Sequence, residues 1–180
     1  MDLNKVNVGD IIFTRDDGFI SNLIRLVETG KPDADVPSHC AIVDCIYLLN
    51  STIVINLIEA SYWGVRHITL DSYLKNSKVW LSRMTGFRDI EKGLKWLDKQ
   101  VGKPYDFTQL IGIFIRALLR WSGLAKFKWA KNFLDSKQEF ICSELVEKYA
   151  DETGERLWNG EIGFVTPYDL FRSENLTIYS

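Results

Sequence analysis

The feature that most constrains the fold is a pair of β-rich runs separated by a very short connection. The runs span His39 to Leu48 and Thr52 to Ala60, and both are rich in β-branched and other apolar residues. Only Leu49, Asn50 and Ser51 lie between them, and so short a connection joins antiparallel neighbours. The sequence therefore predicts a β-hairpin, and with it a fold that contains an antiparallel sheet.

The rest of the chain predicts further strands and several helices. Apolar residues recur at helical spacing from Phe19 to Glu28, in a helix expected to end near Gly30. Further strands are expected at 11–14, 65–70, 79–84 and 176–179, and helical segments at 71–76, 89–101, 110–121, 127–134, 142–151 and 167–173. At 180 residues we expect a single domain, residues 1–180, of the α+β class, with a mostly antiparallel sheet and helices packed to one side.

The overall composition excludes several classes of function. The formal net charge of −2 gives no support for nucleic-acid binding. The N-terminus lacks the basic stretch and apolar run of a signal peptide, and no uninterrupted apolar segment is long enough to span a bilayer. Three cysteines are an odd number for a disulfide framework, so we expect reduced thiols in a cytoplasmic protein. The Cys and His spacings match no zinc pattern, and we expect no metal or cofactor.

One cysteine, Cys142, stands at the start of an amphipathic helical segment, in the run FICSELV at 140–146. A thiol at a helix N-terminus lies among N–H groups without intrahelical partners, at the positive end of the dipole, which favours the nucleophilic thiolate. Only two histidines, His39 and His67, could serve as its base. The segment thus indicates nucleophilic catalysis, and a buried, inert cysteine on an apolar helix face is the alternative.

The predicted hairpin suggests which residue would orient the histidine. If its turn centres on Leu49, His39 and Glu59 are equally far from that residue and lie opposite each other, with Cβ atoms about 5 Å apart. A carboxylate there would hold the imidazole in one tautomer, as the third member of a nucleophile–base–orienter triad. A one-residue bulge would change this register. Taken singly, each residue has a plainer interpretation, a hydrogen-bonded histidine at a strand edge and a solvated carboxylate.

Three other residues compete for these roles. Cys40 follows His39 in the strand and so faces the opposite side of the sheet, which makes it a core residue. Cys45 shares the face of His39 but lies about 20 Å along the strand, and it is also expected in the core. His67 has no obvious acidic partner in the sequence and is expected to be solvated.

Several segments, in their order along the chain, resemble the circularly permuted branch of the NlpC/P60 papain-like superfamily. The resemblance is nearest to the YiiX/YebB-like permuted amidases and their poxvirus relatives, in which the histidine precedes the cysteine, and it covers nearly the whole chain. The matching segments are VGDIIF (8–13), SHCAIV (38–43), IEA (58–60), GKPYDF (102–107), FICSELV (140–146) and TPYDLF (166–171).

This resemblance implies a permuted papain-like fold in which Cys142 is the nucleophile, His39 the base and Glu59 the orienting residue. Tyr105 matches the tyrosine that lies beside the nucleophile in the superfamily, and a packed turn residue is an equally good interpretation of it. The backbone N–H of Cys142 would donate to the oxyanion, and Ser143 is expected in the same neighbourhood.

The segment 108–134 departs from the family pattern, because the gap between Tyr105 and Cys142 is longer than in unpermuted members. It contains no acidic residue, and its basic and aromatic residues are Phe114, Arg116, Arg120, Trp121, Lys126, Phe127, Lys128, Trp129, Lys131 and Phe133. Such an insert would build part of a substrate groove, or meet anionic lipid headgroups at a membrane surface through 116–131. The alternative is a packing helix with a solvated basic face.

The expected function is that of a cysteine hydrolase that cleaves an amide in a peptide or an amide-linked conjugate. A lipid-directed acyltransferase or phospholipase of the related lecithin–retinol acyltransferase-like group is the first alternative, and it predicts an apolar acyl tunnel beside Cys142. A deubiquitinase-like isopeptidase is the second. The third is a catalytically silent module that binds lipid or peptide in the same groove. The expected partner is accordingly a peptide, an amide conjugate or a lipid, and not a nucleic acid.

Overall fold

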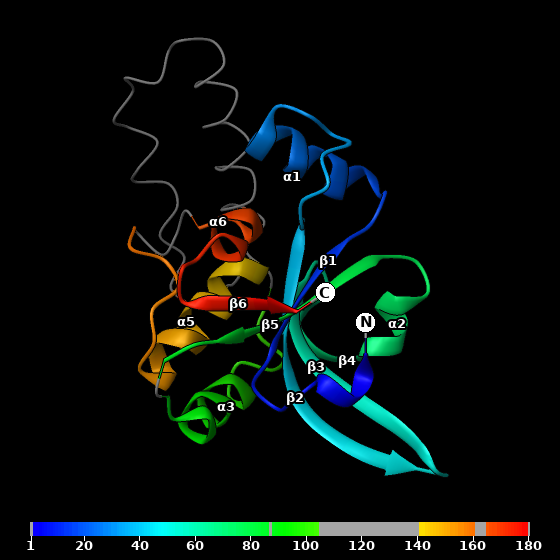
Figure 1. The fold of residues 1–180 in the computed structure, drawn as a ribbon, viewed down its shortest axis with the longest axis vertical. Coiled ribbons are helices and arrows are strands. Elements are labelled where there is room, and N and C mark those ends of the chain that lie inside the picture. The colour runs from blue at the N-terminus through cyan, green and yellow to red at the C-terminus, as the bar shows by residue number, and fades with distance from the viewer. Residues whose placement is uncertain (1, 87, 105–140, 161–164, 180) are drawn as a thin grey trace.

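The computed structural model describes residues 2–86, 88–104, 141–160 and 165–179. These residues form an α+β fold around one six-stranded sheet, with the order β4-β3-β2-β1-β5-β6 and antiparallel pairing between all neighbours (Figure 1). The strands are β1 (Ile11–Arg15), β2 (His39–Leu49), β3 (Thr52–Ser61), β4 (Gly64–Thr69), β5 (Lys78–Met84) and β6 (Leu176–Tyr179). The predicted α+β class and antiparallel sheet are therefore confirmed. The predicted helices at 110–121 and 127–134 and the basic aromatic insert lie outside the described residues.

Helices cover both faces of this sheet. Figure 1 shows α3, α5 and α6 on one side of the strands, and α2 with a short 3₁₀ helix on the other. The bounds are η1 (Leu3–Lys5), α1 (Phe19–Thr29), α2 (Leu70–Leu74), α3 (Ile90–Asp98), α5 (Cys142–Thr153) and α6 (Pro167–Phe171). The prediction that the helices pack to one side is thus incomplete, because the second face of the sheet is also apolar and needs cover.

Two buried clusters explain this two-sided cover. Alternate residues of a strand point to opposite faces, and in β1 both Ile11 and Ile12 are fully buried. On the first face, Leu145, Val146 and Tyr149 of α5 pack with residues of the central strands, and on the second face Leu70 of α2 does so. Because α5 is anchored by its apolar side, its N-terminus is fixed at the sheet.

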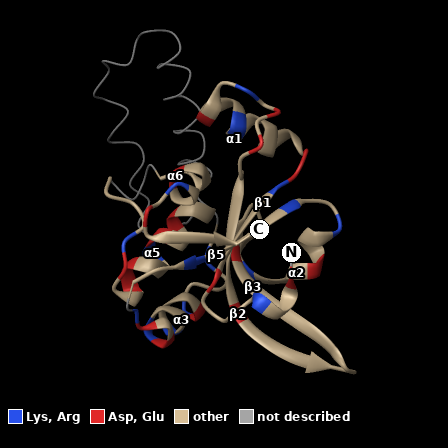
Figure 2. Ribbon diagram, viewed as in Figure 1, with Lys and Arg blue, Asp and Glu red and all other residues tan. Residues whose placement is uncertain are grey.

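Charged side chains lie mainly away from these clusters. Lys and Arg occur together with Asp and Glu on both α3 and α5, so these helices carry both signs of charge (Figure 2). This mixing accords with the small net charge of the chain.

The hairpin turn lies later in the chain than predicted. Leu49 pairs with Thr52, and Asn50 and Ser51 form a two-residue turn with φ of 49° and 64°. Positive φ at both central residues gives a turn whose twist matches that of the flanking strands. The predicted turn centre at Leu49 is therefore wrong, and so is the direct opposition of histidine and carboxylate that it implied.

A β-bulge nevertheless brings the two residues to the same face. The register shifts by one residue between Val43 and Cys45. Counted from the turn without this shift, His39 and Glu59 would point to opposite faces of the sheet, because side chains alternate along a strand. With the shift they are diagonal neighbours on one face. The bulge is thus the feature that allows the histidine and the carboxylate to meet.

Helix α1 buries its polar side. Its buried residues are Ser21 and Arg25, whereas Phe19 is 81% exposed and Ile20 49% exposed. It ends as predicted at Gly30, whose φ of 76° is a left-handed conformation that glycine adopts without strain. The apolar side of this helix therefore does not pack into either of the two core clusters.

Candidate active site

The candidate site lies where the sheet opens at the start of β2. The β2–β3 ladder ends at the pair Ile42–Ile58, although β2 begins at His39 and β3 runs on to Ser61. Beyond the ladder lies a cleft of about 540 Å³, and both His39 and Cys142 line it. The end of one strand and the start of α5 therefore bring together two residues that are about a hundred positions apart in the chain.

Four side chains form a hydrogen-bonded network at the base of the cleft. His39 Nε2 lies 2.7 Å from Glu59 Oε2 and 2.9 Å from the Tyr73 hydroxyl. Tyr73 also donates its hydroxyl hydrogen to Glu59 Oε2. Arg66 Nε donates to the other carboxylate oxygen, Oε1, at 2.8 Å. Glu59 is only 2% exposed, so its charge is neutralised by these partners rather than by water.

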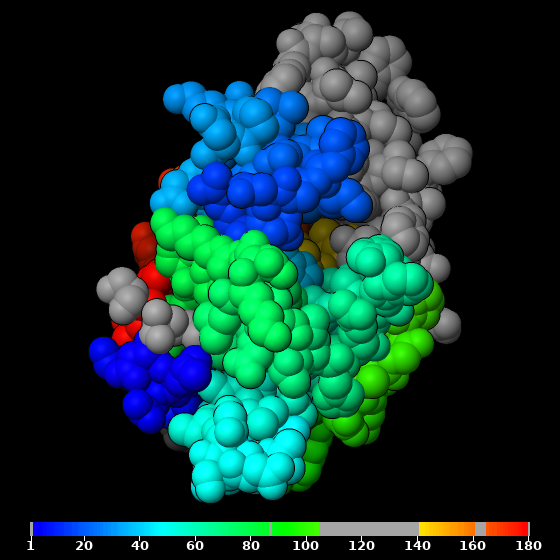
Figure 3. All heavy atoms as spheres, turned by 90° about the vertical axis from the view of Figure 1, so that its right-hand side faces the viewer, coloured from blue at the N-terminus to red at the C-terminus, as the bar shows by residue number. Residues whose placement is uncertain are grey.

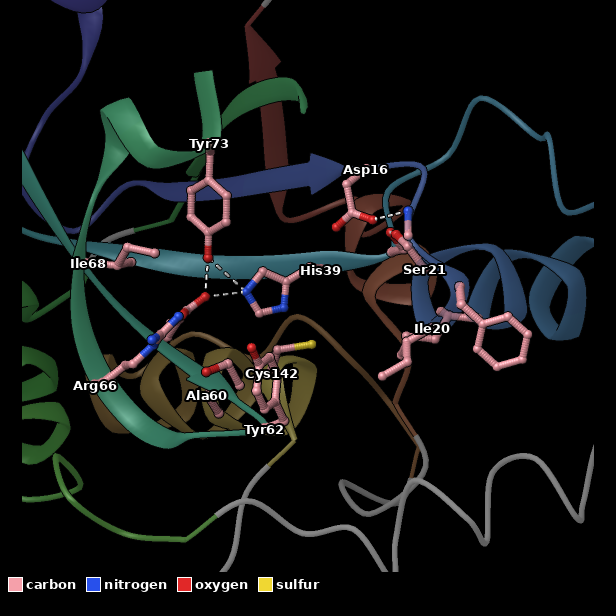
Figure 4. A pocket seen from close by; sticks show the side chains of 16 residues that line it. Asp16, Ile20, Ser21, His39, Ala60, Tyr62, Arg66, Ile68, Tyr73 and Cys142 are labelled. Carbon is pink, nitrogen blue, oxygen red and sulfur yellow. Dashed lines mark hydrogen bonds and ion pairs between the residues drawn. The ribbon is translucent and has the colours of Figure 1, made fainter. Parts of the chain in front are cut away.

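This network fixes the proton on one ring nitrogen. Glu59 is an acceptor, and the Tyr73 oxygen also accepts from the ring because its own hydrogen goes to Glu59. Nε2 of His39 therefore carries a proton, and Nδ1 is left for another partner. In Figure 4 the second ring nitrogen is on the side of the Cys142 sulfur.

The charges of the network stabilise one another. Burial alone would raise the pKa of Glu59, but the hydrogen bond and charge of His39, with the hydrogen bonds of Tyr73 and Arg66, lower this pKa to about 2. Burial would likewise lower the pKa of His39, but the charges and hydrogen bonds of Cys142 and Glu59 raise it to about 10. At neutral pH the site therefore holds an imidazolium between a carboxylate and a thiolate.

Cys142 is the first residue of α5, and its thiol is acidic. Helix geometry leaves the N–H groups of the first turn without intrahelical acceptors and places the positive end of the dipole there. A hydrogen bond from the Cys40 thiol lowers the pKa of Cys142, burial raises it, and the charge and hydrogen bond of His39 lower it further. The pKa of Cys142 is thus well below its usual range, whereas burial and the adjacent Cys142 raise the pKa of Cys40.

The side chain of Ser143 lies away from the cleft. Its side chain is fully buried, and its hydroxyl donates to the Val165 carbonyl at 2.7 Å. The side chain therefore ties the start of α5 to the segment before α6, and it does not line the cleft. Tyr105, the other residue expected beside the nucleophile, lies outside the described residues.

The competing residues lie outside the cleft lining. Cys40 is fully buried, as predicted for a core residue, and Cys45 is partly buried next to the bulge. His67 is half exposed, and its Nδ1 is 3.6 Å from Asp44 Oδ2, which is an acidic partner that the sequence did not reveal.

Sequence reasoning missed the parts played by Arg66, Tyr73 and Cys40. A signal for Arg66 exists, because a two-residue turn after Ser61 places Arg66 directly opposite Glu59 in the β3–β4 hairpin. Tyr73 comes from α2, which crosses the second face of the sheet, and nothing in the local sequence predicts that crossing. Cys40 reaches Cys142 because α5 packs on the face of β2 opposite to that of His39.

Among the residues that the structure describes, no cluster of three or more His, Cys, Asp or Glu could hold a metal ion. Within the same residues no helix has the length and apolarity needed to cross a membrane. Compared with models of known protein families and with curated protein sequences, the chain has no significant match. Its resemblance to the NlpC/P60 superfamily therefore rests on the segments quoted above.

Proposed function

We propose that this protein is a cysteine hydrolase with a permuted papain-like fold, and that it cleaves an amide bond in a peptide or an amide-linked conjugate. The observation that carries the proposal is the position of His39, which bonds to Glu59 at 2.7 Å through Nε2 and meets the acidic Cys142 thiol on its other side. An activated nucleophile, a base and an orienting carboxylate are the parts that acyl transfer requires.

The proposed reaction has two halves. The Cys142 thiolate attacks the carbonyl carbon, and N–H groups at the start of α5 hold the oxyanion. His39 then gives its Nδ1 proton to the departing amine, and an acyl thioester remains on the sulfur. In the second half, His39 takes a proton from water, the resulting hydroxide attacks the thioester, and a carboxylic acid leaves as the thiolate is restored.

Selective alkylation tests the assignment of the nucleophile. At pH 6 to 7, iodoacetamide should modify Cys142 faster than Cys45, as measured by mass spectrometry of the labelled peptides. Cys142→Ala should abolish the fast phase, and His39→Ala should slow it roughly tenfold or more, because the thiolate loses its cationic partner. Cys45→Ala is the matched control and should leave the fast phase intact. Fast labelling that survives in Cys142→Ala would refute the assignment.

A further inference from the structure

Both oxygens of the buried Glu59 carboxylate are fully used by protein donors. Its Oε2 atom bonds to His39 and Tyr73, while its Oε1 atom lies 2.8 Å from both Nε and Nη2 of Arg66. A carboxylate offers about four lone-pair positions, so these contacts fill them without water. One anion therefore connects two cations, the Arg66 guanidinium and the His39 imidazolium.

Strand pairing places Arg66 at this carboxylate. In the antiparallel β3–β4 ladder Arg66 lies directly opposite Glu59, so both side chains project from the same face of the sheet. In Figure 4, Arg66 lies on the side of the His39 ring that carries the dashed contacts, and the Cys142 sulfur lies on another side. The contacts of Arg66 thus lead to His39 through Glu59.

The two halves of the proposed reaction require opposite protonation states of His39. In the first half the imidazolium gives its Nδ1 proton to the departing amine, and in the second half a neutral imidazole takes a proton from water. The second half begins once Cys142 is acylated, and a thioester carries no charge. The anion on the Cys142 side of His39 is then gone, and Glu59 is the anion that remains in hydrogen-bond contact with the ring.

Arg66 offsets the charge of this remaining anion. A nearby anion stabilises an imidazolium, and a cation beside that anion weakens the stabilisation. Because Glu59 is 2% exposed, water screens its charge little, and without Arg66 the whole charge would act on His39. The ring would then stay protonated at neutral pH after Cys142 is acylated, and it could take no proton from water.

The cleft is open enough for water to reach an acylated Cys142. Its volume is about 540 Å³, and Phe19 and Ile20 of α1 line it together with Tyr62 of the β3–β4 turn. In Figure 3 a hollow between α1 (blue) and the region of this turn (teal) leads to part of α5 (olive). Water is therefore at hand for the second half, which then depends on the protonation state of His39.

The other ionisable groups that the structure describes around the site keep one state at neutral pH. Burial raises the pKa of Tyr73, of Cys40 and of Glu28 in α1, so all three hold their protons. Asp16, in the loop before α1, is the other carboxylate of the cleft lining, and it accepts from the backbone N–H of Gly18 at 2.7 Å. The charge that changes beside His39 during the reaction is therefore that of Cys142.

We infer that Arg66 is a positioning residue for the second half of the reaction: by holding Glu59 on the side away from His39, it lets His39 be neutral once Cys142 is acylated. The inference rests on the proposed function and deepens it. Water attacks the thioester carbon as His39 takes its proton, the C–S bond breaks, a carboxylic acid leaves, and the thiolate and imidazolium are restored. Removing the Arg66 charge should spare the attack of Cys142 and slow the release of the acyl group.

Burst kinetics with p-nitrophenyl acetate separate the two halves. The p-nitrophenolate leaves without needing a proton, so the burst reports acylation of Cys142 and the steady state reports release of acetate. In Arg66→Gln the burst rate should stay within about threefold of the parent, while the midpoint of the steady-state pH profile moves up by about one pH unit. Below that midpoint the steady-state rate should accordingly fall roughly tenfold.

Two variants are the controls for this experiment. Arg66→Lys keeps a positive charge opposite Glu59 and should return the midpoint toward the parent value. Arg83→Gln removes an arginine from another buried carboxylate, that of Asp10, which Arg83 Nε contacts at 2.7 Å, and it should behave as the parent does. Loss of burst and steady state together in Arg66→Gln, or a midpoint that does not move, would overturn the inference.

A measurement without substrate separates the inference from the proposed chemistry. Cys142→Ala removes the thiolate, as acylation does, and the pKa of His39 is then measured by NMR with His67, the only other histidine, as an internal reference. Adding Arg66→Gln should raise the pKa of His39 by about one pH unit and leave His67 unchanged. Equal values would overturn the inference. The expected rise, together with no burst in the parent protein, would support the effect of Arg66 on His39 and overturn the hydrolase proposal.

Discussion

At the scale of single residues, the site depends on the contacts of a few buried polar groups. Glu59 is stabilised as an anion by three side chains that donate to it, and His39 by an anion on each side. Cys142 differs from the other two cysteines in standing at a helix N-terminus and in having a second thiol, Cys40, as a donor. The charge state of each of these side chains therefore depends on its neighbours more than on its residue type.

The Cys40 thiol provides a prediction at this scale. Cys40→Ala removes a hydrogen-bond donor to the Cys142 thiolate, so the pKa of Cys142 should rise and alkylation of Cys142 at pH 6 should slow roughly tenfold, since a hydrogen bond to a charged group contributes about 1.5–3 kcal/mol. Cys40→Ser retains a donor of similar size and is the control. The measurement is the rate of Cys142 modification by iodoacetamide against pH, and equal slowing in both variants would contradict the role of the hydrogen bond.

The positions of the candidate site residues could be predicted from the sequence only where a single local pattern was enough. The start of α5 at Cys142 follows from the apolar spacing of that helix. The proximity of His39 and Glu59 follows from the hairpin that their two strands form. The exact register did not follow, because the bulge between Val43 and Cys45 leaves no clear mark in the sequence. The meeting of the two residues was thus predicted correctly from a wrong register.

At the scale of elements, the C-terminal part of α1 makes a buried polar contact with α6. Glu28 Oε1 accepts from the backbone N–H of Tyr168 at 3.4 Å, and Oε2 is buried without a partner among the described residues. Burial raises the pKa of Glu28 to about 8, although hydrogen bonds from Thr166 and Tyr168 oppose this shift. The folded protein therefore keeps a proton on Glu28 that the unfolded chain loses above its ordinary pKa of about 4.5.

This contact predicts a specific dependence of stability on pH. Because the folded state binds the extra proton between pH 4.5 and 8, Glu28 should lower the free energy of unfolding as the pH rises through that window. Glu28→Gln cannot ionise, so it should be more stable than the parent by roughly 1–3 kcal/mol at pH 9 and nearly equal to it at pH 4.5. Urea unfolding at both pH values measures this, with Glu91→Gln in exposed α3 as the control. The same pH difference in both variants would show that Glu28 is not the cause.

Most element bounds could be predicted because their signals are local. The helix at 19–28 and its end at Gly30, the strands of both hairpins and the helix at Cys142 all lie within one or two residues of their predicted bounds. The side of α1 that is buried could not be predicted, because apolar spacing normally points to the core. In this helix the buried hydrogen bonds of Arg25 determine the orientation instead.

At the scale of the whole molecule, one edge of the sheet is joined to the segment that leads to Tyr105. Gly102 donates to the Val65 carbonyl at 2.8 Å, and Val65 donates to the Lys103 carbonyl at 2.9 Å. Gly64 has a φ of 92°, and a Cβ there would lie 2.5 Å from the same Lys103 carbonyl oxygen. The close approach of the two backbones therefore requires glycine at position 64.

A pair of glycine substitutions tests this backbone contact, called here the seam, between β4 and residues 102–103. Gly102→Ala should cost about 1–2 kcal/mol of unfolding free energy, because Gly102 also has a positive φ but open space around it. Gly64→Ala should cost at least 1 kcal/mol more, since its methyl group also collides with a backbone atom that cannot move without breaking the seam. Thermal or urea unfolding measures both, and equal losses would mean that the seam tolerates the methyl group.

The sequence by itself determined the α+β class and most of the elements, and it led to Cys142, His39 and Glu59 as the candidate site, because helical periodicity, strand composition and turns depend on neighbours in the chain. Only the tertiary structure decided the strand order, the opening of the sheet beyond Ile42, the partners Tyr73, Arg66 and Cys40, and the side of α1 that faces the cleft. These depend on contacts between segments that are far apart in the chain, and such contacts are fixed by packing and by buried hydrogen bonds rather than by local pattern.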